Sequence, residues 1–248
     1  MLTEERFKII LDKTQEKKAI TVTELIELLD TSESTIRRDL NALHKMGRLR
    51  KVHGGATVIE DNNTQDEEIR IREKINIEDK DIIAKYAASL INKNDFVYID
   101  AGTTTELLID YITEKKASFV TNSRGVAKKI AQKGLKVYIL GGEFKISTEA
   151  IVGVEAMQGL MKYNFTKGFF GTNGISERTG FSTPDILEAK VKEEAVKRST
   201  KAFILADKSK FNKNSSITFA EIDKAIIITT KLNDDKMKKY AEIVEVSE

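Results

Sequence analysis

The sequence contains no cysteine and only two histidines, His44 and His53, among its 248 residues. Without cysteine no disulfide framework can form, and two histidines cannot supply a Cys/His metal cluster. No segment approaches eighteen uncharged apolar residues, and the charged, helical start lacks the apolar core of a signal peptide. We therefore expect a cytoplasmic protein that does not span a membrane, binds no metal and needs no cofactor.

Two nucleotide-binding motifs are also missing. Neither G-x-x-x-x-G-K-[ST] nor G-x-G-x-x-G occurs, so neither a nucleoside triphosphatase loop nor a dinucleotide fold is supported. The length and the 40% hydrophobic content suffice for a small domain plus one larger core. An acidic stretch without apolar periodicity, Glu60 to Glu68, separates the two. We predict an N-terminal domain over residues 1–57, a linker over 58–76 that becomes helical toward its end, and a second domain over 77–248.

A short amphipathic helix is predicted to follow Ser32, which is a suitable N-cap because its hydroxyl can accept from a free backbone N–H group. Its inward stripe is Ile36, Leu40 and Leu43. The opposite side carries side chains suited to phosphate oxygens, to guanine O6/N7 and to adenine N6/N7. The candidate DNA-binding residues on this helix are Ser32, Ser34, Thr35, Arg37, Arg38 and Asn41.

Two further helices are predicted upstream. One begins at a capping box formed by Thr21 and Glu24, and the turn Asp30-Thr31 separates it from the amphipathic helix. The first helix runs roughly from Glu4 to Glu16. The apolar residues expected to face inward are Phe7, Ile10 and Leu11 on the first helix and Leu25, Leu28 and Leu29 on the second. This order is that of a helix-turn-helix, whose last helix enters the major groove.

Positive charge is concentrated at the end of this domain. Residues 1–31 carry 5 Lys/Arg against 7 Asp/Glu, whereas residues 32–57 carry 6 against 2. From charge alone we would expect a solvated helix face that binds nothing. Because the helices also occur in the order of a helix-turn-helix, we predict that this face binds duplex DNA.

A wing is predicted behind the amphipathic helix. Leu49 and Val52 alternate with basic residues, which indicates a short hairpin strand, and the glycine pair at 54–55 permits a tight turn. Such a wing would place Arg50, Lys51 or His53 along a phosphate backbone, although His53 could equally be a loop residue without a partner.

The rest of the chain alternates helix-like stretches with short apolar runs. The runs are Phe96–Ile99, Ser118–Val120, Val137–Leu140, Gly168–Phe170, Ala202–Leu205 and Ala225–Ile228. This pattern predicts an α/β domain with a mainly parallel sheet covered on both faces, in which ligands bind at the carboxyl ends of the strands.

Polar and glycine residues follow these runs. Gly102 and the hydroxyls of Thr103, Thr104 and Thr105 come directly after Asp100, at the predicted start of a helix. Such a turn can hold a phosphate, although Thr103 and Glu106 could instead form a capping box. Asn122, the pair Gly141-Gly142, Asn173 and the lysine of Asp207-Lys208 follow other runs. Together these residues predict a pocket for a phosphorylated polyol.

The segments Thr35-Ile36-Arg37-Arg38-Asp39-Leu40 and Val52-His53-Gly54-Gly55-Ala56 resemble the signature of the DeoR family of bacterial sugar-metabolism repressors, and the similarity continues through nearly the whole chain. The opening Met1-Leu2-Thr3-Glu4-Glu5-Arg6 is most like the subgroup that represses fructose-utilisation operons. The resemblance implies a winged helix-turn-helix followed by a sensor domain similar to ribose-5-phosphate isomerase. It also implies an effector pocket with Asn173, Glu188, Lys192 and Lys208.

The resemblance argues against catalysis. The isomerases have an aspartate-rich turn where this chain has Gly171-Thr172-Asn173-Gly174, and losing those carboxylates removes a general base. The residues alone leave another interpretation of Glu188 and Lys192, which lie four apart on a predicted helix after Pro184 and could form a surface ion pair.

We thus expect a non-enzymatic repressor that binds operator DNA as a dimer or tetramer and is released by a sugar phosphate, with fructose 1-phosphate as the proposed effector. Two alternatives remain: a sugar-phosphate isomerase with a DNA-binding appendage, and a DNA-binding scaffold with an empty sensor.

Overall fold

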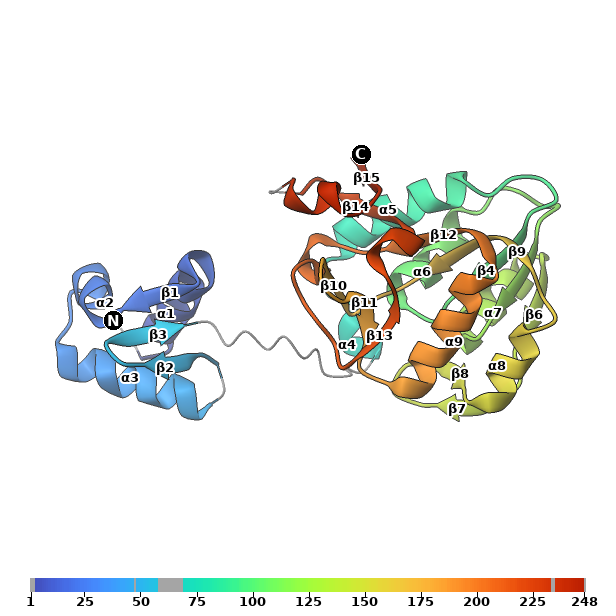
Figure 1. Cartoon of the computed structure of the whole chain (residues 1–248). Coiled ribbons are helices and arrows are strands. Elements are labelled where there is room, and N and C mark those ends of the chain that lie inside the picture. The colour runs from blue at the N-terminus through green and yellow to red at the C-terminus, as the bar shows by residue number, and fades with distance from the viewer. Residues whose placement is uncertain (1–2, 47, 58–68, 233–234, 248) are drawn as a thin grey trace. The chain divides into compact units, whose positions relative to one another are not determined.

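The computed structural model describes residues 3–46, 48–57, 69–232 and 235–247 (Figure 1). The chain divides into two compact units, residues 1–61 and 62–248. The acidic stretch from Glu60 to Glu68 lies outside the described residues. The last part of the predicted linker is described: Ile69–Arg72 forms helix α4.

The first unit is a winged helix-turn-helix. Its elements are α1 (Thr3–Lys17), β1 (Ala19–Thr21), α2 (Val22–Leu29), α3 (Glu33–Lys45), β2 (Arg50–Val52) and β3 (Gly55–Thr57). The strands form an antiparallel sheet in the order β1-β3-β2. The predicted capping box is present, because Thr21 and Glu24 each accept from the backbone N–H group of the other. Asp30 ends α2 in the left-handed conformation (φ 44°), which allows the tight turn into α3.

The predicted apolar stripes form the core of this unit. Fully or nearly fully buried side chains come from the three helices, from β1 and β3 and from the residue before β2: Ile10, Ile20, Val22, Leu25, Leu29, Ile36, Leu40, Leu43, Leu49 and Ala56. Leu28 is a correction, since it is 47% exposed. Leu25 and Leu29 define the buried side of this eight-residue helix. Leu28 lies at the edge of that side and is therefore partly exposed to solvent.

A buried ion pair ties the first helix to the third. Arg6 Nε donates to Asp39 Oδ2 at 2.7 Å, and Arg6 donates a second hydrogen bond to Asp39 Oδ1 at 3.2 Å. The neighbouring carboxylate raises the pKa of Arg6. Asp39 is therefore the one acidic residue of α3 that faces inward, where it positions the helix instead of meeting DNA.

The second unit is built on a seven-stranded parallel sheet in the order β15-β14-β12-β9-β4-β5-β6. The strands are β4 (Phe96–Ile99), β5 (Ser118–Thr121), β6 (Lys136–Ile139), β9 (Phe165–Phe170), β12 (Ser199–Leu205), β14 (Ile226–Thr230) and β15 (Ile243–Val246). All six predicted apolar runs are strands of this sheet. The seventh strand, β15, was missed because its alternating Ile-Val-Glu-Val is short and partly polar.

Helices cover both faces of this sheet, as predicted (Figure 1). Side chains alternate along each strand, so Val97 and Ile99 enter one core and Tyr98 enters the other. The first core lies under α5 (Ile77–Ser89), α6 (Thr103–Leu108) and α7 (Arg124–Gln132). The second lies under α8 (Val154–Leu160) and α9 (Ile186–Lys197).

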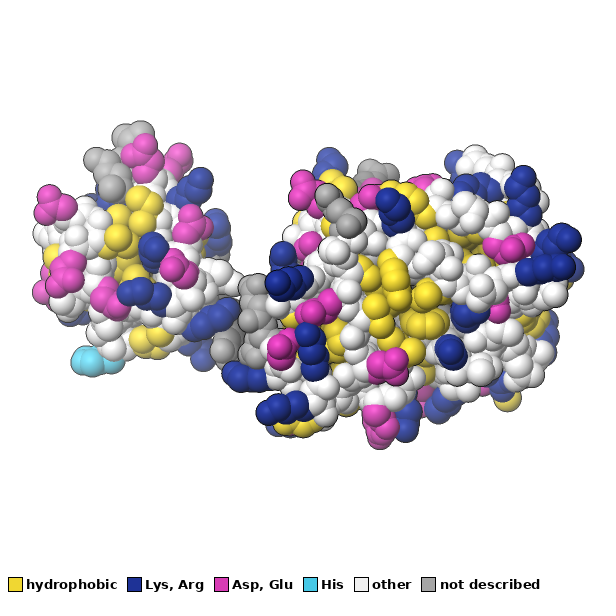
Figure 2. All heavy atoms as spheres, turned by 90° about the horizontal axis from the view of Figure 1, so that it is seen from above, with side chains coloured by type: hydrophobic (Ala, Val, Ile, Leu, Met, Phe, Trp, Pro, Cys, Tyr) yellow, Lys and Arg dark blue, Asp and Glu magenta, His cyan; other side chains and the backbone are white. Residues whose placement is uncertain are grey.

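Two small antiparallel sheets were not predicted. One is the hairpin β7 (Glu143–Lys145) and β8 (Ala150–Val152), and the other contains β10 (Gly174–Ser176), β11 (Gly180–Thr183) and β13 (Ile217–Ala220). These strands have three or four residues and lack a long apolar run, so periodicity does not reveal them. Acidic and basic side chains are interspersed over the visible face of the second unit (Figure 2). Within the described residues, no helix is long and apolar enough to cross a membrane.

We predict that Asp39→Asn loosens the first unit, because it leaves the buried Arg6 guanidinium without a carboxylate. Hydrogen exchange over residues 3–57 should become faster in Asp39→Asn than in the wild type. The control is Asp12→Asn, which changes an exposed carboxylate of α1 in the same unit. Equal exchange rates in the two variants would show that the pair does not hold the helices.

Candidate functional site

The start of α3 presents a cluster of hydroxyl groups. Ser32 is the N-cap, and its Oγ accepts from the backbone N–H of Thr35 at 3.3 Å. Ser32 Oγ also lies 3.0 Å from Ser34 Oγ and 2.9 Å from Thr35 Oγ1. These hydroxyls sit beside the free N–H groups of a helix start, which is an arrangement that suits a DNA phosphate.

The exposed face of α3 carries both predicted arginines. Arg37 pairs with Glu33 one turn earlier, with Nε donating to Oε1 at 2.7 Å. Arg38 is exposed and has no hydrogen-bond or ion-pair partner among the described residues. Glu33 thus holds one guanidinium in place, and the other is free to meet an acceptor.

The wing is joined to the recognition helix by a side-chain contact. Lys51 Nζ donates to Asn41 Oδ1 at 2.7 Å, while Arg50 and His53 are exposed. The turn requires both glycines for different reasons. Gly54 has a φ of 81°, and a Cβ on Gly55 would lie 2.2 Å from the backbone oxygen of Ile20 on β1. The nine predicted DNA-binding residues therefore lie on α3, its N-cap and the wing of one unit.

The second unit has a polar pocket at the carboxyl ends of its central strands. The pocket is partly open to solvent. Its walls come from four parts of the chain. They are Arg72, Ile75 and Lys80; Ala101, Gly102, Thr103 and Thr104; Gly171, Thr172, Asn173, Glu188 and Lys192; and Leu205, Ala206, Asp207 and Lys210.

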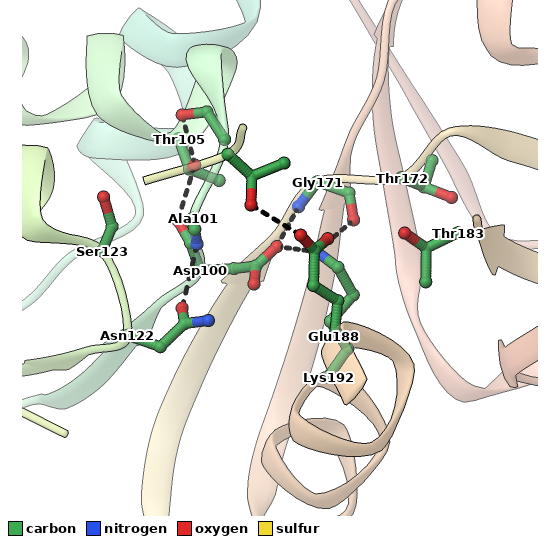
Figure 3. A network of polar contacts seen from close by, with 12 residues as sticks. Asp100, Ala101, Thr105, Asn122, Ser123, Gly171, Thr172, Thr183, Glu188 and Lys192 are labelled. Carbon is green, nitrogen blue, oxygen red and sulfur yellow. Dashed lines mark hydrogen bonds and ion pairs between the residues drawn. The ribbon is translucent and has the colours of Figure 1, made fainter. Parts of the chain in front are cut away.

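A buried ion pair lies at one wall of this pocket (Figure 3). Asp100, at the end of β4, is 1% exposed and pairs through Oδ2 with the ammonium of Lys192 on α9. The backbone N–H of Gly171 donates to the same oxygen at 3.0 Å, and Lys192 also donates to the Gly171 carbonyl at 3.2 Å. Burial raises the pKa of Asp100, and Lys192 opposes that rise. Asp100 Oδ1 is buried without a hydrogen-bond partner among the described residues.

Glu188 and Lys192 do not form the surface ion pair that their spacing allows. Both are buried, and each has another partner. Glu188 Oε1 accepts from Thr148 Oγ1 at 2.6 Å and lies 3.1 Å from Lys145 Nζ. The surface-pair interpretation is therefore wrong, and the two side chains belong to the wall of the pocket.

Asn122 and Thr105 lie behind the pocket wall and hold its shape. Asn122 Oδ1 accepts from the Tyr98 hydroxyl and from the backbone N–H of Ala101, both at 3.0 Å. Thr105 Oγ1 donates to the carbonyls of Asp100 and Gly102. These contacts fix the loop from β4 to α6 on both sides.

The loop leaves the start of α6 without a side-chain cap. The N-cap is Gly102, and no side chain accepts from the first turn. The capping-box alternative is wrong, since Glu106 lies 3.7 Å from Lys129 instead. Thr103 and Thr104 line the pocket within the first helical turn, whose N–H groups lack intrahelical acceptors.

Besides Asp100, Thr105 and Asn122, which lie behind the wall, three predicted residues do not line this pocket. Gly141 and Gly142 are exposed after β6, the last strand of the sheet, which is separated from β9 by two other strands. Lys208 is 56% exposed in its side chain and lies 3.7 Å from Asp79, while its neighbours Asp207 and Lys210 line the pocket. Residues 208–210 form a short 3-10 turn, so the side chains of Lys208 and Lys210 point in different directions.

Arg72 and Lys80 line the pocket and were missed. Lys80 is 5% exposed, and its ammonium donates to the backbone carbonyl of Arg72. Burial lowers the pKa of Lys80 to about 8. A lysine in a charged helix is ordinarily solvated, so nothing in the local pattern distinguishes Lys80 from its neighbours. Lys80 is buried because residues 69–76 pack close to the edge of the sheet.

No group of three His, Asp or Glu side chains suited to a metal ion occurs in the described ranges. A DNA-recognition unit and a polar pocket occur on one chain. This combination defines a transcriptional regulator that carries its own sensor.

The chain belongs to the DeoR family. Residues 6–62 match the DeoR-like helix-turn-helix domain, and residues 75–231 match the DeoR C terminal sensor domain. The chain is 41% identical over 243 residues to the uncharacterized HTH-type transcriptional regulator FruR of Bacillus subtilis, covering 98% of this chain and 96% of FruR. It is 33% identical to the lactose phosphotransferase system repressor of Streptococcus mutans, covering 98% and 100%.

A solved structure of ribose 5-phosphate isomerase A from Methanocaldococcus jannaschii is also similar, with 16% identity and a TM-score of 0.40. That similarity covers 55% of each chain. The protein is thus a DNA-binding transcriptional repressor of carbohydrate metabolism, as the resemblance implied.

The pKa of Lys80 leads to a stability prediction. Between pH 8 and pH 10.5 the unfolded chain binds a proton at this lysine and the folded chain does not, so stability contributed through Lys80 rises with pH. The wild type should therefore gain stability relative to Lys80→Met when the pH is raised from 7 to 10. We expect about 1–2 kcal/mol after allowance for solvent screening, measured by urea denaturation.

The matched control is Lys85→Met, which removes an exposed lysine of the same helix. Its stability difference from the wild type should stay constant over this pH range. A constant difference for Lys80→Met as well would mean that Lys80 titrates like a solvated lysine.

Proposed function

We propose that this repressor controls a fructose-utilisation operon and that fructose 1-phosphate releases it from its operator. The pocket carries the proposal, because it combines amide and hydroxyl donors at Gly102–Thr104 with carboxylate, amide and ammonium groups on the facing wall. Similarity to the fructose-operon subgroup supports the choice of sugar, and FruR of Bacillus subtilis is 41% identical.

The phosphate would bind at the start of α6. The N–H groups of the first turn and the hydroxyls of Thr103 and Thr104 are donors, and a dianion is the acceptor that they suit. The sugar hydroxyls would then face Asn173, Glu188 and Lys192 across the pocket. Asp100, Thr105 and Asn122 support this wall from behind, whereas Gly141, Gly142 and Lys208 have no place in the proposed contacts.

Operator binding would use a dimer or tetramer. Two copies of α3 would enter successive major-groove half-sites about 34 Å apart, with the wing residues Arg50, Lys51 and His53 on the phosphate backbone. Effector binding would favour an arrangement of the copies that no longer matches this spacing. A tenfold loss of operator affinity needs a coupling free energy of about 1.4 kcal/mol, which is typical of allosteric proteins.

The pocket does not favour the isomerase alternative. The carboxylates at or beside the pocket are engaged: Asp100 pairs with Lys192, Glu188 accepts from Thr148 and lies beside Lys145, and Asp207 Oδ1 accepts from Asn76 and from the backbone N–H of Ser209. This engagement disfavours a role as general base, since a base must reach the proton that it abstracts. The close relatives are named as regulators and repressors.

Arg37→Ala should weaken operator binding by about 1–3 kcal/mol if Arg37 contacts a base. Binding is measured at fixed salt by fluorescence anisotropy with a labelled operator. Lys8→Ala is the control, because it removes one exposed positive charge from α1 of the same unit. Arg37 would be removed from the interface if the two variants bound equally well.

Thr103→Val should leave operator affinity unchanged and raise the effector concentration needed for release at least tenfold, or about 1.4 kcal/mol. The effector is first identified by thermal shift with hexose and pentose phosphates, each compared with its unphosphorylated parent. Thr113→Val, an exposed threonine outside the pocket, is the control. If the effector released Thr103→Val from the operator at wild-type concentrations, the proposed phosphate site would be wrong. If the purified protein converted any sugar phosphate, the proposal that it is a repressor without enzymatic activity would be wrong.

A further inference from the structure

Residues 69–76, the connecting segment, bring the chain into the second unit. Its first residue, Ile69, is buried and donates its backbone N–H to the Ser147 carbonyl at 3.0 Å. Its last residue, Asn76, donates from Nδ2 to Asp207 Oδ1 at 2.9 Å. The segment is thus attached at both ends, and between these attachments Arg72 and Ile75 line the pocket.

The pocket wall next to this segment has an excess of positive charge. Arg72, Lys80 and Lys210 all line it, with Asp207 as the acidic residue on the same side. Lys80 is almost fully buried, yet no carboxylate lies within 4.0 Å of its ammonium among the described residues. Its hydrogen bond goes to a neutral carbonyl, that of Arg72.

Asp207 and Glu73 favour the charged form of Lys80 only from beyond ion-pair distance, so its burial stays costly, and an anion placed beside the ammonium relieves that cost. Arginine adds a planar pair of donors that matches phosphate oxygens. Both side chains line the pocket that also contains Gly102, Thr103 and Thr104. An anion in the pocket would therefore have cationic groups on one side and the donors of α6 on the other.

We propose that the anionic group of the effector is bound by Lys80 and Arg72 as well as by the start of α6, so that the effector holds the connecting segment against the sensor unit. This inference rests on the proposed function and adds two effector-binding residues to it. It also implies that effector binding acts on the DNA-binding unit through residues 69–76, because this segment would contact the ligand and directly follows the link to that unit in the sequence.

Occupancy then changes the attachment of the segment in a defined direction. Without an anion, burial, Lys210 and Arg72 all disfavour the charged form of Lys80, and Asp207 and Glu73 only partly offset them. A bound phosphate adds an anionic partner for Lys80 and a contact through the guanidinium of Arg72. The bound segment is more firmly docked than the empty one.

The test uses the full chain with inorganic phosphate and fructose 1-phosphate as probes. Isothermal titration should show at least tenfold weaker binding to Lys80→Met and to Arg72→Gln than to the wild type. Lys85→Met and Lys74→Gln are matched controls, since both residues are exposed and neither lines the pocket. Lys80→Arg, which keeps the charge, should recover part of the affinity.

The second readout is hydrogen exchange over residues 69–76. Adding a saturating probe should slow exchange there in the wild type and in both controls, and should have little effect in Lys80→Met and Arg72→Gln. Arg72 is only partly buried, so Arg72→Gln keeps the test valid if Lys80→Met does not fold.

Three results would overturn the inference, and they separate it from the proposed function. Wild-type affinity in both Lys80→Met and Arg72→Gln would remove these residues from the site and leave the effector proposal standing. Weakened binding without any change in exchange over 69–76 would remove the coupling to the segment. No binding of either probe to the wild type would overturn the inference and the fructose 1-phosphate proposal together.

Discussion

The ion pair between Asp100 and Lys192 joins the carboxyl end of β4 to helix α9, and the pocket is built around it. β4 carries the loop that leads to α6, while α9 carries Glu188 and presents Lys192 to Gly171 at the end of β9. Removing one partner would leave a buried charge uncompensated, which costs about 3–5 kcal/mol in proteins generally. The pair therefore sets the distance between the two walls that a ligand would bridge.

The same interaction limits the chemistry of the pocket. General-base catalysis needs a carboxylate that reaches the proton it abstracts, whereas here Asp100 Oδ2 pairs with Lys192, and Glu188 contacts Thr148 and Lys145. These contacts also give the pocket a defined shape against which the segment 69–76 can dock.

Local patterns in the sequence predicted much of the fold. Six apolar runs became six strands of the parallel sheet, and the stripe Ile36, Leu40 and Leu43 became the buried side of α3. The hairpin β7–β8 and the sheet of β10, β11 and β13 escaped prediction, because strands of three or four residues carry too little periodicity. Leu28 shows the converse error, since an apolar residue on a short helix need not be buried.

What the sequence determined by itself was that polar and glycine residues follow the strands and at which strand ends they lie. Turn residues after each run are local features, and parallel strands must bring them to one edge. Only the tertiary structure decided which of them meet. Gly141 and Gly142 follow an edge strand and stay apart, while Arg72 and Lys80 enter the pocket from a segment with no binding motif. The charge environment of Lys80 depends on contacts between residues distant in sequence, and local pattern carries no information about such contacts.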